Sequence, residues 1–134
     1  MLSTKKIVIT AVCIVALTVG IFGGRYIISV EKYKKTIKEI KIGTVDLSKI
    51  SDGTYTGSFD AVYIAAKVSV TVKDNKITNI VLLNHKNERG KPAEVIPEKV
   101  VEAQSLQVDT ISGATNSSKV ILKSIENALE SAKS

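Results

Sequence analysis

The residues of this sequence best suited to chemistry lie in one short segment near its C-terminal end, Val108–Ser118. The segment carries five hydroxyl side chains together with Asp109 and Gly113, and it leads into a stretch with helical periodicity. The first N–H groups of a helix have no intrahelical partner and lie at the positive end of the helix dipole, so they bind anions. Gly113 permits a close turn of the backbone, and Ala114 leaves room beside it. These residues predict a phosphate site at a helix N-terminus.

Two other interpretations fit the same residues. Ser and Thr are among the commonest helix N-caps, and a capping loop requires no ligand. Asn116-Ser117-Ser118 also matches the N-glycosylation sequon, a three-residue pattern that arises often by chance. On residue types alone, the capping loop is the simplest of the three.

The remaining composition provides little for catalysis. The chain has one Cys, Cys13, one His, His85, and no Trp. Zinc sites, disulfide frameworks, haem attachment, iron–sulfur clusters and Cys/His nucleophile pairs all need more than these residues. Aromatic residues make up 4% of the chain, so we expect no aromatic cage. We predict no catalytic residue and no metal site.

The positive charge of the chain is confined to its first part. Residues 1–50 contain nine Lys or Arg against three Asp or Glu, whereas residues 51–134 contain ten of each. A neutral domain on a basic stalk indicates electrostatics close to a membrane surface rather than a phosphate-binding face for DNA or RNA. We therefore expect no nucleic-acid partner.

An apolar stretch near the N-terminus predicts a transmembrane anchor. Residues 7–24 are free of charge, with Lys5 and Lys6 before them and Arg25 after them. Eighteen residues approach the length that crosses the bilayer core, whereas a cleaved signal peptide, the alternative, has a shorter apolar region. The prediction is a single-pass anchor in contact with membrane lipid, preceded by a cytoplasmic N-terminus at residues 1–6.

Residues 25–50 are predicted to form a basic helical stalk or linker. The apolar positions of its first part recur at spacings of four and three: Tyr26, Val30, Tyr33, Ile37 and Ile40. We expect a helix that continues the anchor, with a short coiled-coil seam as the alternative. The excess of Lys on this side of the anchor favours a cytoplasmic domain, but C-terminal domains can translocate despite such charges.

The pattern of residues 51–134 predicts one α+β domain. β-Forming residues cluster in three ranges, 54–59, 62–72 and 77–83. Asp and Asn between the last two ranges are typical of a hairpin turn. A polar loop at 85–92 should follow, with His85 as a surface residue.

Two helices are expected after the strands. The first covers 93–105, with Pro97 favouring a true start at Ile96, and the second covers 118–132. Strands followed by helices indicate a small antiparallel β-sheet with two helices packed on one face.

The segment Asp109-Thr110-Ile111-Ser112-Gly113-Ala114-Thr115-Asn116-Ser117 resembles the flavinylation motif of the FMN-binding domain family. That family includes peripheral subunits of sodium-translocating NADH:quinone reductase and of related ferredoxin-linked complexes, and small flavoproteins of bacterial envelope electron transfer. Its motif runs Asp, a few residues, Ser/Thr-Gly-Ala-Thr, one residue, and a Ser or Thr acceptor. Asp52-Gly53-Thr54-Tyr55-Thr56-Gly57 also resembles the opening strand of the family, and the similarity covers nearly all of residues 51–134.

The resemblance implies that FMN is joined by a phosphoester to Ser117, with Ser118 and Thr115 as chemically competent acceptors nearby. The residues expected to bind the cofactor are Ser117, Thr115, Ala114, Gly113, Ser112, Asp109, Ser118 and Lys91. In this family a separate Mg²⁺-dependent flavin transferase makes the bond from FAD. A Ser hydroxyl is a poor nucleophile without a base, and no His lies nearby in sequence. FMN held without a covalent bond is the alternative.

Lys91 is included among the expected cofactor-binding residues because of its charge and not because of the family resemblance. Arg89 or Lys91 could pair with the flavin phosphate or with the electron-rich end of the reduced ring. The alternative is a basic loop that faces water, as most charge clusters do.

The function expected from these features is that of a membrane-anchored, extracytoplasmic flavoprotein that shuttles electrons between partner redox proteins. Members of the family face away from the cytoplasm, which decides the orientation against the charge count. One alternative is a non-redox envelope binding module, in which 109–118 only caps a helix. Another is a flavin-dependent reductase, for which His85 is the only candidate acid or base at neutral pH.

Overall fold

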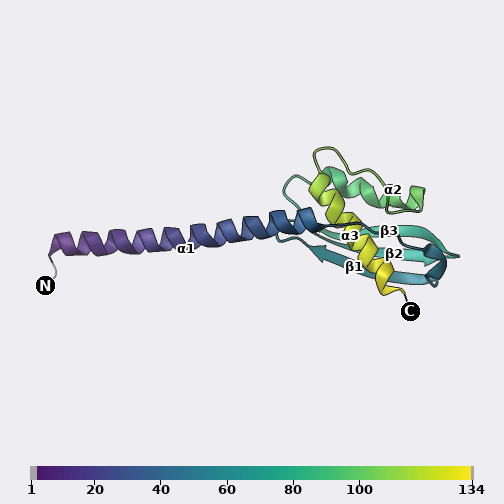
Figure 1. The fold of residues 1–134 in the computed structure, drawn as a ribbon, viewed down its shortest axis with the longest axis horizontal. Coiled ribbons are helices and arrows are strands. Elements are labelled where there is room, and N and C mark those ends of the chain that lie inside the picture. The colour runs from purple at the N-terminus through teal and green to yellow at the C-terminus, as the bar shows by residue number, and fades with distance from the viewer. Residues whose placement is uncertain (1–2, 134) are drawn as a thin grey trace.

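The computed structural model describes residues 3–133, and it shows a long N-terminal helix projecting from a small domain of strands and helices (Figure 1). In chain order the elements are α1 (Thr4–Glu39), η1 (Leu47–Lys49), β1 (Gly53–Asp60), β2 (Ala65–Lys73), β3 (Lys76–Lys86), η2 (Lys91–Val95), α2 (Ile96–Ala103) and α3 (Thr115–Ser131). The predicted α+β class, with an antiparallel sheet preceded by a long apolar helix, is confirmed.

The three strands form one antiparallel sheet in the order β1-β2-β3. Asp74 and Asn75 form the turn between β2 and β3 with positive φ angles of 52° and 61°, as the hairpin prediction requires. Apolar side chains alternate along β2, so one face of the sheet is buried and the other faces solvent. The buried residues of β2 are Ala66, Val68, Val70 and Val72.

β3 contains a bulge that changes which side chains face inward. The register shifts between Lys67 and Val68 of β2, and this shift leaves Leu83 of β3 as an extra, unpaired residue. Without the bulge, simple alternation would carry His85 to the outer face. With it, His85 lies opposite the buried Ala66 and on the same face. The expectation that His85 belongs to a surface loop is therefore wrong, because the bulge interrupts the alternation from which strand length is inferred.

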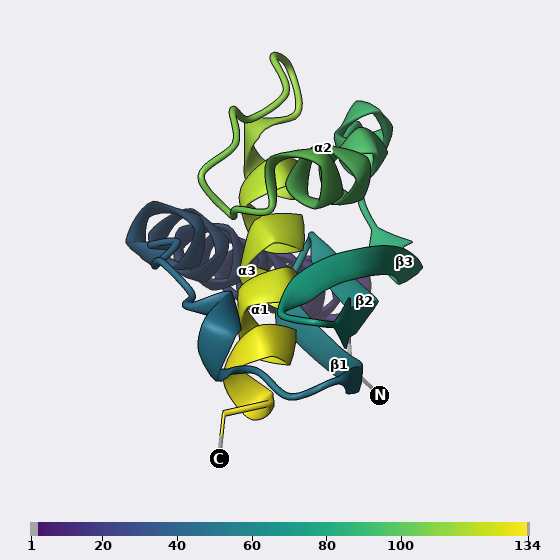
Figure 2. The same ribbon diagram turned by 90° about the vertical axis from the view of Figure 1, so that its right-hand side faces the viewer.

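α3 lies across the buried face of the sheet and packs on β1 and β2 (Figure 2). A Cβ on Gly57 of β1 would overlap the α3 backbone at Ser124 and Ala128, so this glycine allows helix and strand to approach at backbone distance. α3 begins at Thr115, three residues before the predicted start. Thr, Asn and Ser favour caps and turns over helix interiors, which explains the late prediction.

α2 contacts β3 and α3 and completes the core. It begins at Ile96, with Pro97 in its first turn, as predicted, and it ends two residues before the predicted end, at Ala103. Gln104 then adopts a left-handed conformation with φ of 51°. Its side-chain amide pairs with the backbone N–H and carbonyl of Ile77 at 2.8 and 2.7 Å, which ties the end of α2 to the start of β3.

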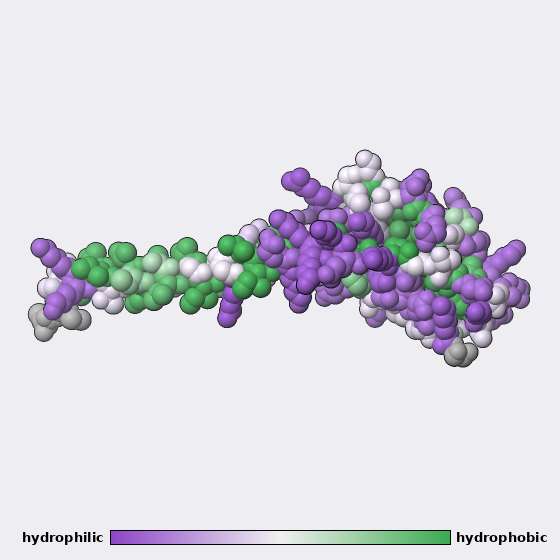
Figure 3. All heavy atoms as spheres, viewed as in Figure 1, coloured by the Kyte–Doolittle hydropathy of each residue, from purple (hydrophilic) through white to green (hydrophobic). Residues whose placement is uncertain are grey.

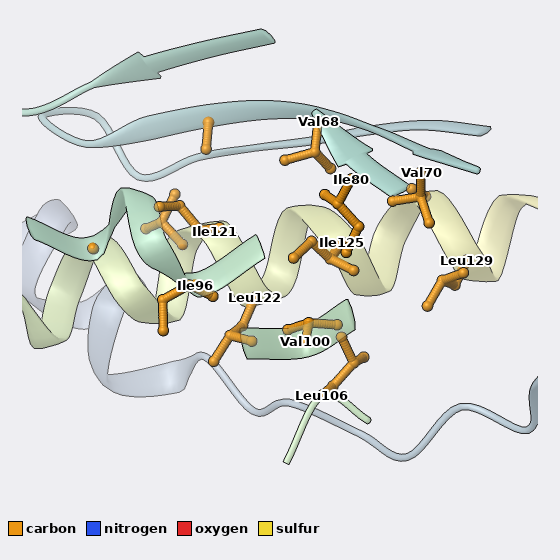
Figure 4. Packing of buried hydrophobic residues seen from close by; sticks show 14 of the residues in the cluster. Val68, Val70, Ile80, Ile96, Val100, Leu106, Ile121, Leu122, Ile125 and Leu129 are labelled. Atoms are coloured by element: carbon orange, nitrogen blue, oxygen red, sulfur yellow. The ribbon is translucent and has the colours of Figure 1, made fainter. Parts of the chain in front are cut away.

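The core lies between the sheet and the two helices of the domain. Figure 4 shows side chains of β2 and β3 meeting side chains of α3, with α2 on the other side of α3. The residues labelled there are Val68, Val70, Ile80, Ile96, Val100, Leu106, Ile121, Leu122, Ile125 and Leu129. Both helices lie on the same side of the sheet, so the buried strand residues are covered from one side only.

α1 is one continuous helix that runs from the apolar stretch into the predicted stalk and ends at Glu39. It is long and apolar enough to cross a membrane, and its apolar residues are exposed along the projecting part (Figure 3). Its last turns meet the domain, where Ile37 is buried. Residues 40–50 then pack against the domain: the N–H of Gly43 donates to Glu126 Oε2 at 3.1 Å, and Ile50 is part of the core.

Candidate functional site

A cavity of about 570 Å³ opens where the end of α1 meets the loops of the domain. Its volume lies in the range of about 300–1,000 Å³ that is usual for cofactor and small-molecule sites. Four segments of the chain supply its walls: α1 with Tyr26, Val30, Tyr33 and Lys34, the β1–β2 loop with Tyr63 and Ile64, the loop after β3 with Glu88, Arg89 and Gly90, and the start of α3 with Gly113, Ala114, Thr115, Asn116 and Ser117.

Ser117 lies in the first turn of α3 and is only 1% exposed. Its hydroxyl oxygen is 3.0 Å from Nε2 of His85, which reaches it from the end of β3. Gly90 lies against the same hydroxyl, because a Cβ at this position would overlap Ser117 Oγ. The predicted acceptor is therefore held in a fixed position at the wall of the cavity.

The contact between His85 and Ser117 is a feature of the site that the sequence reasoning did not predict. Its side chain is 3% exposed, with Nδ1 3.7 Å from Glu94 Oε2 and 3.3 Å from Asn87 Nδ2. In sequence His85 and Ser117 are 32 residues apart, on different elements. The only signal available was that the sole His of the chain follows an apolar strand, and the bulge hid which face of the strand it occupies.

Tyrosines form part of the cavity wall. The rings of Tyr33 and Tyr63 meet edge to face, with centroids 5.5 Å apart and an interplanar angle of 76°. The side-chain amide of Asn116 donates to the Tyr33 hydroxyl at 3.0 Å, which ties α1 to the start of α3. With Tyr26, three of the four tyrosines of the chain line the cavity. The cavity therefore has aromatic rings in its wall despite the low aromatic content of the chain, because that content does not determine where the few rings lie.

The N-terminus of α3 is arranged for an anion. Within the described residues 3–133 no side chain caps this helix, whose N-cap residue is Ala114. N-capping therefore does not explain why this segment is rich in hydroxyl groups. The N–H groups of the first turn have no intrahelical partner and lie at the positive end of the helix dipole. Arg89 and Lys34 also line the cavity, and Glu88 is the one acidic side chain among the described residues of its wall.

The structure separates the eight predicted site residues into three groups. Gly113, Ala114, Thr115 and Ser117 line the cavity, whereas the exposed side chains of three others lie outside its lining: Ser112, Asp109 and Lys91.

Ser118 is fully buried behind the wall. Its hydroxyl donates to the carbonyl of Ala114 at 2.8 Å and accepts from the N–H of Ile111 at 3.0 Å, so it holds the loop in shape. Of the two basic candidates in the loop after β3, Arg89 lines the cavity and Lys91 does not.

Known proteins resemble this chain across the domain. The FMN-binding domain family matches residues 64–130. The NADH:acrylate oxidoreductase of Vibrio harveyi is 37% identical over 85 residues, which are 61% of this chain and 8% of that protein. The crystal structure of the CPE2226 protein from Clostridium perfringens is similar with a TM-score of 0.51 and 26% identity, covering 62% of this chain and 88% of that one. The chain spans less than a tenth of the length of the Vibrio relative.

The residues around the cavity suit a flavin mononucleotide. Its isoalloxazine ring needs an apolar and aromatic wall, which Tyr33, Tyr63 and Ile64 offer. Its phosphate needs hydrogen-bond donors and positive charge, which the start of α3 and Arg89 offer. The family match covers half of the chain, including most of this cavity wall. The chain belongs to the FMN-binding domain family, and its cofactor is FMN.

Proposed function

We propose that the chain is a membrane-anchored electron carrier whose FMN is joined to Ser117 by a phosphoester and lies outside the cytoplasm. The observation that carries the proposal is the placement of the Ser117 hydroxyl, in the cavity wall at the start of α3 and 3.0 Å from His85 Nε2. Ser118 is a less suitable attachment residue because its hydroxyl already donates one hydrogen bond and accepts another within the loop.

FMN supplies reversible electron transfer when it is bound, and the protein supplies attachment, orientation and a shaped environment. Ser117 and the first turn of α3 would hold the phosphate, and Arg89 and Lys34 would balance its charge. Tyr33 and Tyr63 would contact the ring and exclude water from one side of it. Similarity to an NADH:acrylate oxidoreductase supports a redox role, in which electrons reach FMN from one partner protein and leave to another.

The proposed topology places residues 1–6 in the cytoplasm, residues 7–24 in the bilayer, and the FMN-binding domain at 51–134 outside. Support for the anchor comes from the length and apolar surface of α1. Support for the outward orientation comes from the resemblance to envelope flavoproteins. The basic stalk at 25–50 would lie at the membrane surface, where Lys and Arg interact with anionic lipid.

The attachment is tested on the full chain in detergent, co-produced with a Mg²⁺-dependent flavin transferase. Intact mass under denaturing conditions should rise by one FMN less water. Ser117→Ala should abolish this gain, whereas Thr115→Ala, which removes the aliphatic hydroxyl two residues away in the cavity wall, should retain it.

Other outcomes of the same experiment identify the alternatives. Yellow protein that releases its FMN on denaturation would exclude the phosphoester and leave non-covalent binding. A folded, colourless protein would overturn the electron-carrier proposal in favour of a binding module. For the topology, protease added to spheroplasts should digest the domain; protection of the domain until the membrane is permeabilised would place it in the cytoplasm.

A further inference from the structure

We infer that His85 is the general base that removes the proton from Ser117 when flavin is attached. The inference rests on the proposed attachment at Ser117 and assigns part of its chemistry to this chain rather than to the transferase. A Ser hydroxyl is a weak nucleophile until a base accepts its proton, and His is the usual base at neutral pH.

The geometry meets the requirement for proton transfer. His85 Nε2 and Ser117 Oγ are 3.0 Å apart, within the range of about 2.6–3.2 Å expected of a base and its proton donor. Both side chains are almost fully buried, at 3% and 1% exposure, so bulk water does not compete for the contact. The backbone of Gly90 also lies close to the hydroxyl, since a Cβ at this position would overlap Ser117 Oγ.

The ring needs its other proton on Nδ1 for Nε2 to act as an acceptor. Two groups face Nδ1: the Glu94 carboxylate at 3.7 Å and the amide nitrogen of Asn87 at 3.3 Å. The amide hydrogens of Asn87 have another acceptor in the His85 carbonyl, also at 3.3 Å. The full negative charge of Glu94 favours the tautomer with its proton on Nδ1, which leaves Nε2 free to accept the proton of Ser117.

The step is balanced with FAD as the co-reactant that the transferase delivers. Ser117 Oγ bonds to the phosphorus on the flavin side of the FAD diphosphate, and the bond from that phosphorus to the bridging oxygen breaks. AMP leaves with the bridging oxygen, and the hydroxyl proton passes to His85 Nε2. The resulting imidazolium lies beside the phosphodiester anion that has just formed, where a charge-assisted hydrogen bond stabilises it.

A purely structural role for His85 predicts different behaviour. Buried polar groups normally have hydrogen-bond partners, and His85 and Ser117 could simply satisfy one another. Gln at position 85 can still hydrogen-bond to the hydroxyl but cannot accept its proton. The comparison of His85→Gln with the wild type therefore separates a base from a hydrogen-bond partner.

The experiment follows the mass gain over time in the purified full chain, in detergent with Mg²⁺, excess FAD and saturating transferase. The rate for His85→Gln should fall at least about 100-fold, the contribution expected of a general base. His85→Ala should be equally slow and regain rate when imidazole is added. Lys86→Gln, which changes the exposed neighbour on the same strand, should react at the wild-type rate.

The possible failures are distinguishable. A wild-type chain that gains no mass would overturn the proposed attachment itself, and the inference with it. A wild-type chain that gains FMN while His85→Gln reacts equally fast would overturn only the inference and assign the base to the transferase. A slow His85→Ala variant that keeps the wild-type melting temperature but is not rescued by imidazole would reduce His85 to a structural partner.

Discussion

Gly90 lies so close to Ser117 that a methyl group on its Cα would occupy the position of the Ser117 hydroxyl. Its φ of −92° is open to any residue, so the contact rather than the backbone conformation requires a glycine. The N–H of Gly90 donates to Asn87 Oδ1 at 3.0 Å, which holds this backbone against the hydroxyl. The loop after β3 is thus part of the proposed attachment site, although it shares no sequence motif with it.

Gly90→Ala should impair flavin attachment more than folding. The new methyl group would push the Ser117 hydroxyl away from His85, and we expect the attachment rate to fall by about 10-fold or more, in line with the sensitivity of such reactions to small displacements. Gly43→Ala is the matched control, because its Cβ would meet only the end of the Glu126 side chain at 3.4 Å. Time-resolved intact mass measures both, and equal rates would show that the loop can move away.

Arg89→Gln should weaken the binding of FMN but not of riboflavin, which lacks the phosphate. A hydrogen bond to a charged group contributes about 1.5–3 kcal/mol, so the FMN dissociation constant should rise by roughly 10-fold to 100-fold. Titration of Ser117→Ala protein, which cannot form the bond, gives this constant directly. Lys91→Gln is the control, since Lys91 lies outside the cavity lining; a larger loss from Lys91→Gln would contradict the assignment.

Tyr63→Ala should weaken flavin binding for riboflavin and FMN alike, because it removes an aromatic wall rather than a phosphate contact. Loss of the ring area and of its aromatic contact is expected to cost about 1–3 kcal/mol of binding free energy. Tyr55→Phe should bind normally, since its hydroxyl donates to the carbonyl of Ser51, away from the cavity lining. Fluorescence titration in the Ser117→Ala background would detect the difference, and unchanged affinity for both flavins would exclude a stacking role.

Gly57→Ala should destabilise the domain by about 1–3 kcal/mol, the usual cost of overpacking, because the methyl group would collide with the backbone of α3. The thermal midpoint of unfolding, followed by circular dichroism, should fall by several degrees. Thr56→Ala, at the exposed neighbouring position of β1, should change the stability by no more than about 0.5 kcal/mol. A Gly57→Ala variant as stable as Thr56→Ala would mean that α3 shifts freely on the sheet.

The ring of His85 should carry its proton on Nδ1 in the resting protein. Nitrogen-15 NMR of the imidazole distinguishes the two tautomers. Removing the charge near Nδ1 in Glu94→Gln should move the population toward the tautomer protonated at Nε2, since Asn87 then becomes the dominant neighbour. A wild-type ring protonated at Nε2 would contradict the positioning role of Glu94.

The sequence predicted the turns and helix starts that depend on residues close together in the chain. Asp74 and Asn75 turn the hairpin, and Pro97 fixes the start of α2 at Ile96. The segment around Ser117 was identified from residue types and family resemblance, and the structure places it in the cavity wall.

The remaining features depend on contacts between distant residues. His85 faces Ser117 because a bulge at Leu83 changes its side of the sheet, and such an irregularity has no strong local signal. Tyr33 and Tyr63 meet only when the end of α1 docks on the domain. Single-sequence patterns describe each element separately, so they cannot show which elements meet.

α1, the helix proposed to anchor the protein in the bilayer, also provides one wall of the cofactor cavity. A helix rises about 1.5 Å per residue, so Tyr26 and Lys34 lie only about 3 and 15 Å beyond Gly24, where the apolar stretch ends. In the proposed topology, α1 would therefore fix the distance between the flavin and the lipid. Redox molecules dissolved in the membrane would find FMN at the lipid headgroups, and a fragment lacking α1 would carry its flavin with one side uncovered.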